Sequence, residues 1–152
     1  MLQQICEEIH NFFISDARVG TYEVTGGRIT LDWLKEGQRF WIVGSDLNDG
    51  VYTYHQSGIK NDDDKTAVTM PDEVFGGTVC AMAVPRGVIE IAEEIGVWNT
   101  AYAESVNSPY QSETFNGYSY TKASGSGGKG ADPATWQGHF ASRLNAWRKA
   151  AL

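Results

Sequence analysis

Residues 85–102 carry the strongest helical pattern in the sequence, and this pattern most constrains what the chain can fold into. Apolar side chains recur there every three or four residues, at Val88, Ile91, Ala92, Ile95, Trp98 and Tyr102. This spacing places them on one face of a helix, while Glu90, Glu93 and Glu94 fall mostly on the other face. Pro85 suits the first helical position, where its missing N–H would have no partner. The sequence therefore predicts an amphipathic helix whose apolar face other elements must cover.

Two further stretches have a one-sided helical pattern. Over residues 2–14 the apolar positions are Leu2, Ile5, Cys6, Ile9, Phe12 and Phe13. Over residues 133–150 one face carries Trp136, Phe140, Arg143, Leu144 and Trp147, after an N-cap at Asp132. We expect the first of these helices to bury its stripe against the helix over 85–102.

Residues 20–84 change to the pattern of short strands. Gly26-Gly27 and Asn48-Asp49-Gly50 are turn sequences that tolerate positive φ, and each lies between two strand-like runs. Further runs over 66–70 and 78–84 bring the number to five or six short strands. This spacing is typical of a small barrel or a strongly curled sheet.

These patterns predict the α+β fold class: a small bundle of three main helices with an inserted antiparallel β subdomain. Residues 1–19 and 85–152 would form the helical core with a C-terminal arm and helix, and residues 20–84 the inserted subdomain. A chain of 152 residues with 41% hydrophobic residues can bury a core without a metal or a disulfide. We expect Cys6 and Cys80 to be buried, reduced thiols.

The sequence also limits the environment of the protein. Its first residues lack the basic start and apolar run of a signal peptide, and its longest wholly apolar run, over 79–84, is far too short for a membrane span. We therefore expect a soluble protein, made in the cytoplasm, with no membrane partner.

The net charge of −7 is unevenly distributed. Residues 1–104 carry 7 Lys or Arg and 17 Asp or Glu, a net charge of −10, whereas residues 105–152 carry 5 and 2, a net charge of +3. This asymmetry suits docking to an oppositely charged surface, although solvated acidic faces explain it equally well. No basic stripe typical of a duplex-DNA binder is visible.

Motifs for catalysis and cofactors are weak. Gly125, Gly127 and Gly130 match a dinucleotide fingerprint literally, but no hydrophobic strand precedes them. The segment 46–50 has the wrong spacing for a calcium loop, and the three histidines lack metal-ligand spacing. The sequence predicts no cofactor, no metal and no enzyme activity. An unrecognised hydrolase remains an alternative and would need a cleft with perturbed pKa values.

The predicted sheet is rich in aromatic residues, namely Trp33, Phe40, Trp41, Tyr52 and Tyr54. Because side chains alternate between the faces of a strand, some of these must be core and others exposed. An exposed set would make a stacking platform. This leaves open a second function, a β-barrel binding module for carbohydrate or single-stranded nucleic acid.

One tract resembles a known family. The sequence Ser112-Glu113-Thr114-Phe115-Asn116-Gly117-Tyr118-Ser119-Tyr120 is similar to the segment that follows the main helix in tailed-phage head–tail connector proteins, also called adaptor or head-completion proteins. The runs over 37–45, 48–52, 72–77 and 82–85 are similar to prophage members that carry a β insertion, and the ending over 136–149 also fits. One departure is Asn116 before Gly117, where the family usually has glycine directly after the hydrophobic residue.

The resemblance implies a structural virion protein of the virion neck, made in the bacterial host cytoplasm. Such proteins form a ring, often of twelve copies, below the portal, extend the DNA channel and dock the next neck or tail component. The implied partners are copies of itself, the portal protein and a neck or tail completion protein, with DNA only as cargo. A negative lumen would let DNA slide without binding.

We expect the contacts with these partners to lie in residues 108–150. A polar, aromatic strand over 113–120 can add to the edge of a neighbouring sheet, and a Gly/Ser-rich link before a basic helix gives that helix reach. Aromatic residues and arginine dominate interface anchors. The predicted interface residues are Glu113, Phe115, Gly117, Tyr118, Ser119, Tyr120, Trp136, Arg143, Trp147 and Arg148. The alternative is that the last helix merely packs on the first two.

Overall fold

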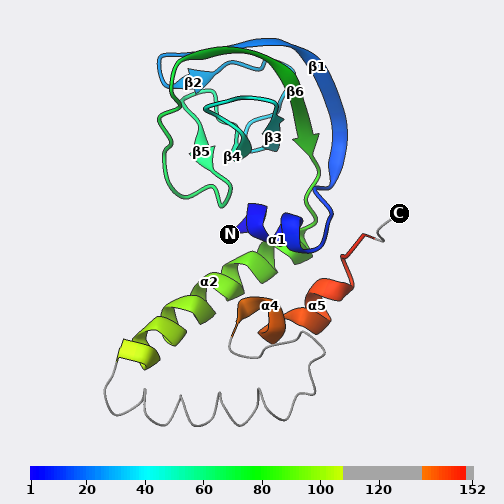
Figure 1. The fold of residues 1–152 in the computed structure, drawn as a ribbon, viewed down its shortest axis with the longest axis vertical. Coiled ribbons are helices and arrows are strands. Elements are labelled where there is room, and N and C mark those ends of the chain that lie inside the picture. The colour runs from blue at the N-terminus through cyan, green and yellow to red at the C-terminus, as the bar shows by residue number, and fades with distance from the viewer. Residues whose placement is uncertain (108–134, 150–152) are drawn as a thin grey trace.

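The computed structural model describes residues 1–107 and 135–149, with the backbone alone over 103–107. Its main body is a curled, antiparallel six-stranded sheet in the order β2-β1-β6-β3-β4-β5, a half-barrel that stands above the helices in Figure 1. The strands are β1 (Ile14–Thr25), β2 (Arg28–Ile29), β3 (Arg39–Val43), β4 (Gly50–Thr53), β5 (Lys60–Asn61) and β6 (Glu73–Met82). The helices are α1 (Leu2–Glu8), α2 (Arg86–Asn107), α4 (Trp136–His139) and α5 (Ala141–Asn145).

The inner face of the half-barrel encloses its own hydrophobic core. Phe40 and Ile42 contribute to this core from β3. The other buried members include Val24, Ile29, Leu31, Tyr54, Ile59, Met70, Phe75 and Val79. The segment over 66–70 closes one end of the curl. There Val68 N–H donates to the Ile59 carbonyl and Met70 N–H to the Gly27 carbonyl, both at 2.9 Å.

A second core lies where the helices meet the outer side of the sheet. It contains the apolar faces of α1 and α2, together with Phe140 and Leu144 from the C-terminal helices and Val51 and Met82 from the sheet. The predicted apolar face of α2 is correct, since Val88, Ile91, Ala92 and Ile95 are all buried. The expectation that the first helix packs against this face is also correct.

The predicted fold class is wrong in its organisation, because the sheet and not a three-helix bundle is the main body. Only α2 is long among the helices of the described residues. The expected helix over 133–150 is two short helices with a break at Phe140, whose φ of −102° and ψ of 11° are not helical. The expected helix over 2–14 ends at Glu8, and Phe13 has a φ of 53°.

The connection between α1 and β1 explains why the chain turns from helix to strand so early. The N–H of Phe13 donates to the side-chain oxygen of Asn11 at 3.0 Å, while the amide of Asn11 donates to the Trp147 carbonyl at 3.1 Å. Lys149 N–H donates to the Ile9 carbonyl at 2.9 Å. These contacts are with the C-terminal segment and are invisible to a local pattern. Residues 14–19, which the helical pattern placed in the helical core, therefore form the first half of β1.

Candidate functional site

β1 and β6 form a long ribbon whose outer strand has an open edge. Their pairing runs from Ile14 opposite Met82 to Val24 opposite Glu73, with one irregularity between Ile14 and Asp16. On its other side β1 pairs only with β2, and only at its last two residues. In the described part of the chain, nothing pairs with this side of β1 from residue 16 to residue 23. Figure 1 shows β1 as the outermost strand along one side of the molecule.

The open strand is exposed on both faces as well as at its edge. All residues over 14–21 are exposed, although their side chains alternate between the two faces of the sheet. Val19 is 82% exposed and Ile14 is 50% exposed, and Val74 on the neighbouring strand is 66% exposed. A long edge strand with exposed β-branched side chains is a surface on which another strand can pair.

The turn at the end of β1 determines which backbone groups are free. Gly26 and Gly27, with φ of 65° and 83°, make a two-residue hairpin that pairs Thr25 with Arg28. The residues that flank such a turn exchange backbone hydrogen bonds, so the N–H and C=O of Thr25 point away from β6. The N–H and C=O groups of successive residues point alternately to the two sides of a strand, and the pairing of β1 with β6 is unbroken back to Asp16. The N–H and C=O groups of Ala17, Val19 and Thr21 therefore point to the open edge.

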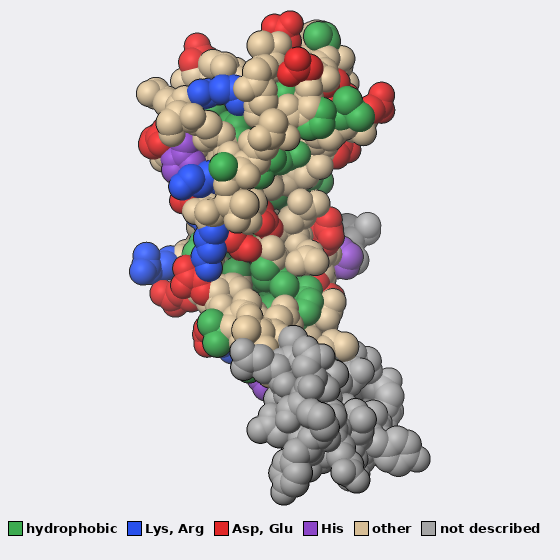
Figure 2. Space-filling model, turned by 90° about the vertical axis from the view of Figure 1, so that its left-hand side faces the viewer, with side chains coloured by type: hydrophobic (Ala, Val, Ile, Leu, Met, Phe, Trp, Pro, Cys, Tyr) green, Lys and Arg blue, Asp and Glu red, His purple; other side chains and the backbone are tan. Residues whose placement is uncertain are grey.

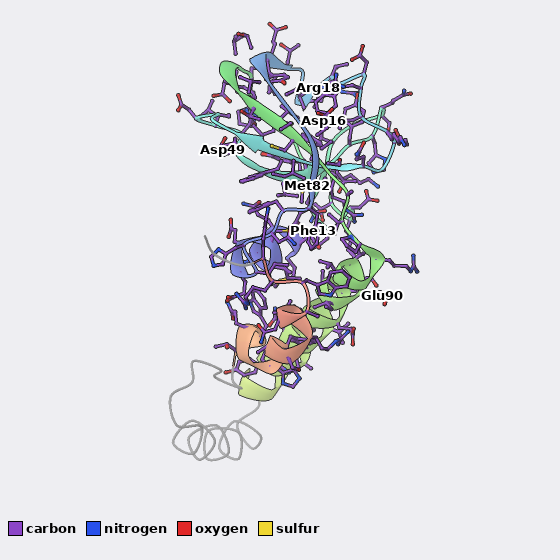
Figure 3. All side chains as sticks on the ribbon, turned by 90° about the vertical axis from the view of Figure 1, so that its right-hand side faces the viewer. Phe13, Asp16, Arg18, Asp49, Met82 and Glu90 are labelled. Atoms are coloured by element: carbon purple, nitrogen blue, oxygen red, sulfur yellow. The ribbon has the colours of Figure 1, made fainter. Side chains whose placement is uncertain are left out.

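Charged and aromatic side chains contact one another along this strand. The Arg18 guanidinium lies 4.3 Å from the centre of the Trp33 ring, and its Nε lies 3.1 Å from an oxygen of Asp16. The Tyr22 hydroxyl donates to the Arg18 carbonyl at 2.5 Å. Figure 3, which looks at the β1 side, shows Asp16 and Arg18 close together along the strand. Over residues 16–18 the open edge therefore presents one anion and one cation, two residues apart, on the same face.

Sequence reasoning missed this edge. Residues 14–19 contain two charges and no apolar alternation, because neither face of the strand is buried. The one available signal is that β-branched and aromatic residues continue upstream of the two-glycine turn, at Val19, Thr21 and Tyr22.

The interface residues predicted near the C-terminus make contacts within this chain. Trp136 and Trp147 are half-buried against the helical core, and the Trp147 ring lies 6.3 Å from that of Phe13 in an edge-on arrangement. Arg143 is bidentate to Glu94 at 2.9 and 2.5 Å, and Arg148 donates to the Glu8 carbonyl at 2.6 Å. The other predicted interface residues, Glu113, Phe115, Gly117, Tyr118, Ser119 and Tyr120, lie outside the described residues.

A shallow groove runs between α2 and the C-terminal helices. It encloses about 820 Å³ and is lined by Glu90, Glu93, Glu94, Val97, Trp98, Ala101, His139, Phe140 and Arg143. Figure 2 looks at the α2 side and shows hydrophobic side chains among acidic ones above the residues drawn in grey. Val97 is 72% exposed on this helix. The groove therefore combines apolar side chains with three glutamates, His139 and Arg143.

The polar cluster closest to an enzyme's arrangement is structural. Both ring nitrogens of His55 are engaged, with Glu36 and with Asp64, each at 2.6 Å. The hydrogen bonds to Asp64 and Glu36 raise the pKa of His55 above its ordinary value of 6.5. A general base needs a free ring nitrogen near a substrate, and here both nitrogens hold loops together. Within the described residues, no group of three or more His, Cys, Asp or Glu side chains could hold a metal ion.

The aromatic side chains of the sheet do not form an open stacking platform. Phe40 and Tyr54 are buried in the half-barrel, and the Tyr52 hydroxyl donates to the Asn48 carbonyl at 2.8 Å. Trp41 is covered by the Phe12 ring, whereas Trp33 lies beneath Arg18. These rings therefore pack within the fold or, in the case of Trp33, contact Arg18 of β1.

Comparison of this chain with protein-family models, with curated proteins and with solved structures finds no match. In the described segments, no helix combines the length and the apolar character needed to cross a membrane.

Proposed function

We propose that this protein is a structural assembly subunit, and that it serves as a tailed-phage head–tail connector protein. The observation that carries the proposal is the open edge of β1, which is exposed on both faces and toward which the backbone groups of Ala17, Val19 and Thr21 point. A strand of this kind in a stable fold is suited to pair with another polypeptide. The subunit would join copies of itself in a ring below the portal, extend the DNA channel and dock the next neck or tail component.

The tract over 112–120 supports the more specific part of this proposal, because it resembles the segment that follows the main helix in connector proteins. The acidic surface supports a lumen that repels DNA, since residues 1–104 carry a net charge of −10. Contacts with phosphate would release counterions and hold DNA in place, whereas an acidic lining avoids such contacts.

Capture on a purified portal ring tests the proposal. The wild-type protein should be retained, and Tyr118→Ala and Tyr120→Ala should weaken retention if the resemblance is meaningful. Val19→Asp should weaken assembly of the captured subunits into a ring, because it places a charge on the open strand. Leu47→Asp is a matched control, since Leu47 is 59% exposed but lies in the loop between β3 and β4. Absence of wild-type capture on the cognate portal would contradict the proposal.

A second candidate function is a β-barrel binding module for carbohydrate or single-stranded nucleic acid. The architecture favours it, because a half-barrel as the main body is more typical of such modules than of a helical connector core. A hollow of about 430 Å³ beside the hairpin is lined by Arg28, Thr30, Leu31, Asp32, Leu34, Tyr54 and Gln56. The Nε of Arg28 there is buried without a hydrogen-bond partner. Against this candidate, the curl is filled by the chain's own side chains.

Titration with oligosaccharides and with single-stranded oligonucleotides separates the two functions. Binding in the micromolar range that Arg28→Gln abolishes would favour the binding module. Portal capture without such binding would favour the assembly subunit.

A further inference from the structure

We propose that, before assembly, two copies of this protein pair through the open edges of β1 and so hide them in a two-fold dimer. The inference rests on the proposed function, because it names what covers the same edge until the assembly partner replaces it. An uncovered strand edge invites uncontrolled association, and proteins usually blunt such edges with charged side chains, proline or a bulge. β1 has no lysine and no proline, its one irregularity lies at its start, between Ile14 and Asp16, and it carries no charge between Arg18 and Glu23. The edge therefore needs a cover in the free protein.

The direction of the backbone groups restricts how two such edges can pair. The free groups belong to the odd-numbered residues Ala17, Val19 and Thr21. In a symmetric antiparallel pair, hydrogen-bonded positions must therefore bring odd residues opposite odd residues. A register that pairs odd-numbered with even-numbered residues is excluded. The backbone groups of the even-numbered residues already point toward β6 and cannot bond to the second copy.

Charge then selects one register among those that remain. If Ala17 lies opposite Ala17 of the second copy, Asp16 of each strand faces Arg18 of the other. If residue 18 lies on the two-fold axis, Arg18 faces Arg18, and if residue 16 lies on the axis, Asp16 faces Asp16. Like charges directly opposite one another destabilise a sheet. With Val19 on the axis, Arg18 would face Gly20 and Asp16 would face Tyr22. Only the register centred on Ala17 places both Asp16 and Arg18 opposite an opposite charge, and Glu23 then lies beyond the residues that face β1 of the second copy.

The selected register is favourable at close range. Asp16 and Arg18 occupy non-hydrogen-bonded positions, where opposed Cα atoms lie about 4.5 Å apart and side chains are closest. Their side chains are about half exposed, at 49% and 52%, so each can reach across the axis. Ala17 is small enough to place two backbones together at the axis without a clash of side chains. The dimer would extend the sheet across both molecules, and it would have to open before the same edge joins a ring.

A disulfide at the axis tests the register. Ala17 lies opposite Cys80 within the chain, so the background variant is Cys80→Ala, which prevents an internal disulfide. In this background, Ala17→Cys should cross-link two copies under mild oxidation, because hydrogen-bonded pairs place Cα atoms about 5.5 Å apart. Val19→Cys in the same background is the matched control and should cross-link at least tenfold more slowly. Faster cross-linking at Val19 than at Ala17 would overturn the register.

Charge reversal tests the pairing without cysteine. Arg18→Glu and Asp16→Arg should each weaken the dimer about tenfold in sedimentation equilibrium, because each places like charges opposite one another. The double variant Asp16→Arg with Arg18→Glu should restore most of the affinity, since the exchanged charges pair in the same register. An unchanged urea midpoint for each variant shows that the fold is kept. A wild-type protein that stays monomeric up to about 1 mM would overturn the inference, whereas the function as an assembly subunit is judged separately by portal capture.

Discussion

The rings of Phe12 and Trp41 stack face to face, with centroids 3.8 Å apart and planes within 5° of parallel. Phe12 belongs to the connection between α1 and β1, whereas Trp41 lies in the middle of β3. The stack therefore fixes the N-terminal segment on the outer side of the sheet, where the helical core begins.

Replacing Phe12 tests this stack. Phe12→Ala should lower the free energy of unfolding by about 2 kcal/mol, less than for a fully buried phenylalanine because Phe12 is half-buried. Phe12→Leu keeps most of the apolar area but not the stacking and should lose about half as much. Urea unfolding followed by tryptophan fluorescence measures both. Equal, negligible losses would show that the stack does not hold the segment.

Two glycines of α2 should respond oppositely to alanine. A Cβ on Gly87 would lie 2.9 Å from Cζ2 of Trp147, whereas a Cβ on Gly96 meets nothing within 4 Å. Gly96→Ala should stabilise the protein by about 0.5–1 kcal/mol through helix propensity. Gly87→Ala should be less stable than Gly96→Ala by about 1 kcal/mol or more, because it displaces the Trp147 ring. Thermal unfolding of both variants makes the comparison, and equal stabilisation would contradict the packing of Trp147 on α2.

The contacts of His55 predict a dependence of stability on pH. Hydrogen bonds from the His55 ring to Asp64 and Glu36 raise the pKa of His55, and hydrogen bonds from Gln56 N–H and the His55 ring lower the pKa of Glu36. A raised histidine pKa stabilises the fold fully below the unfolded value near 6.5, and this contribution is lost as the pH rises through the folded pKa. The Glu36 contribution is present above its ordinary value near 4.5 and is lost as the pH falls through its lowered pKa.

The matched variant for this prediction is His55→Gln. The difference in urea midpoint between wild type and His55→Gln should be larger at pH 6 than at pH 9. An NMR titration of the His55 ring should give a pKa above 6.5. A difference in midpoint that is the same at both pH values would rule out a charged His55 as the cause.

The two cysteines should be unreactive in the folded protein. Both are buried and unpaired, and burial raises the pKa of Cys6 to about 12 and that of Cys80 above its ordinary value. The thiolate is the reactive form, so a thiol reagent at pH 8 should label neither in buffer and both in urea. Mass spectrometry of the labelled protein counts the modified sites. Rapid labelling of Cys6 without denaturant would contradict its place in the helical core.

Arg143 distinguishes an internal contact from a partner contact. Its ion pair with Glu94 is exposed, and hydrogen bonding to this arginine lowers the pKa of Glu94. Exposed pairs contribute little to stability, so Arg143→Gln should change the urea midpoint only slightly. If Arg143 also anchors a partner, the same variant should weaken portal capture at least tenfold, whereas Arg86→Gln, another exposed arginine paired along α2, should not. Equal capture by both variants would remove Arg143 from the interface.

The parts of the fold that could be predicted depend on local chemistry. The Gly26-Gly27 hairpin follows from two residues that accept positive φ, and α2 follows from its apolar spacing. What could not be predicted depends on distant contacts. The Asn11 amide ends the first helical segment by reaching the Trp147 carbonyl, and the break at Phe140 interrupts a stretch whose apolar spacing alone suggested one helix.

The candidate site could not be predicted because its residues are exposed and leave no hydrophobic pattern in the sequence. The edge of β1 is buried on neither face, so it leaves no hydrophobic alternation from which a strand could be read. His55 likewise meets Glu36 and Asp64 only through the loops that carry them, and no spacing in the sequence indicates that contact.

Adjacent residues of β3 belong to different cores, since Phe40 faces the interior of the half-barrel and Trp41 faces the helices. β3 therefore contributes side chains to both hydrophobic cores, so removing the strand would disrupt both of them. A shortened gene lacking residues 20–84 would delete the surface on which the helices rest, and its product would be a target for proteases. A shortened form of this protein must therefore keep the sheet.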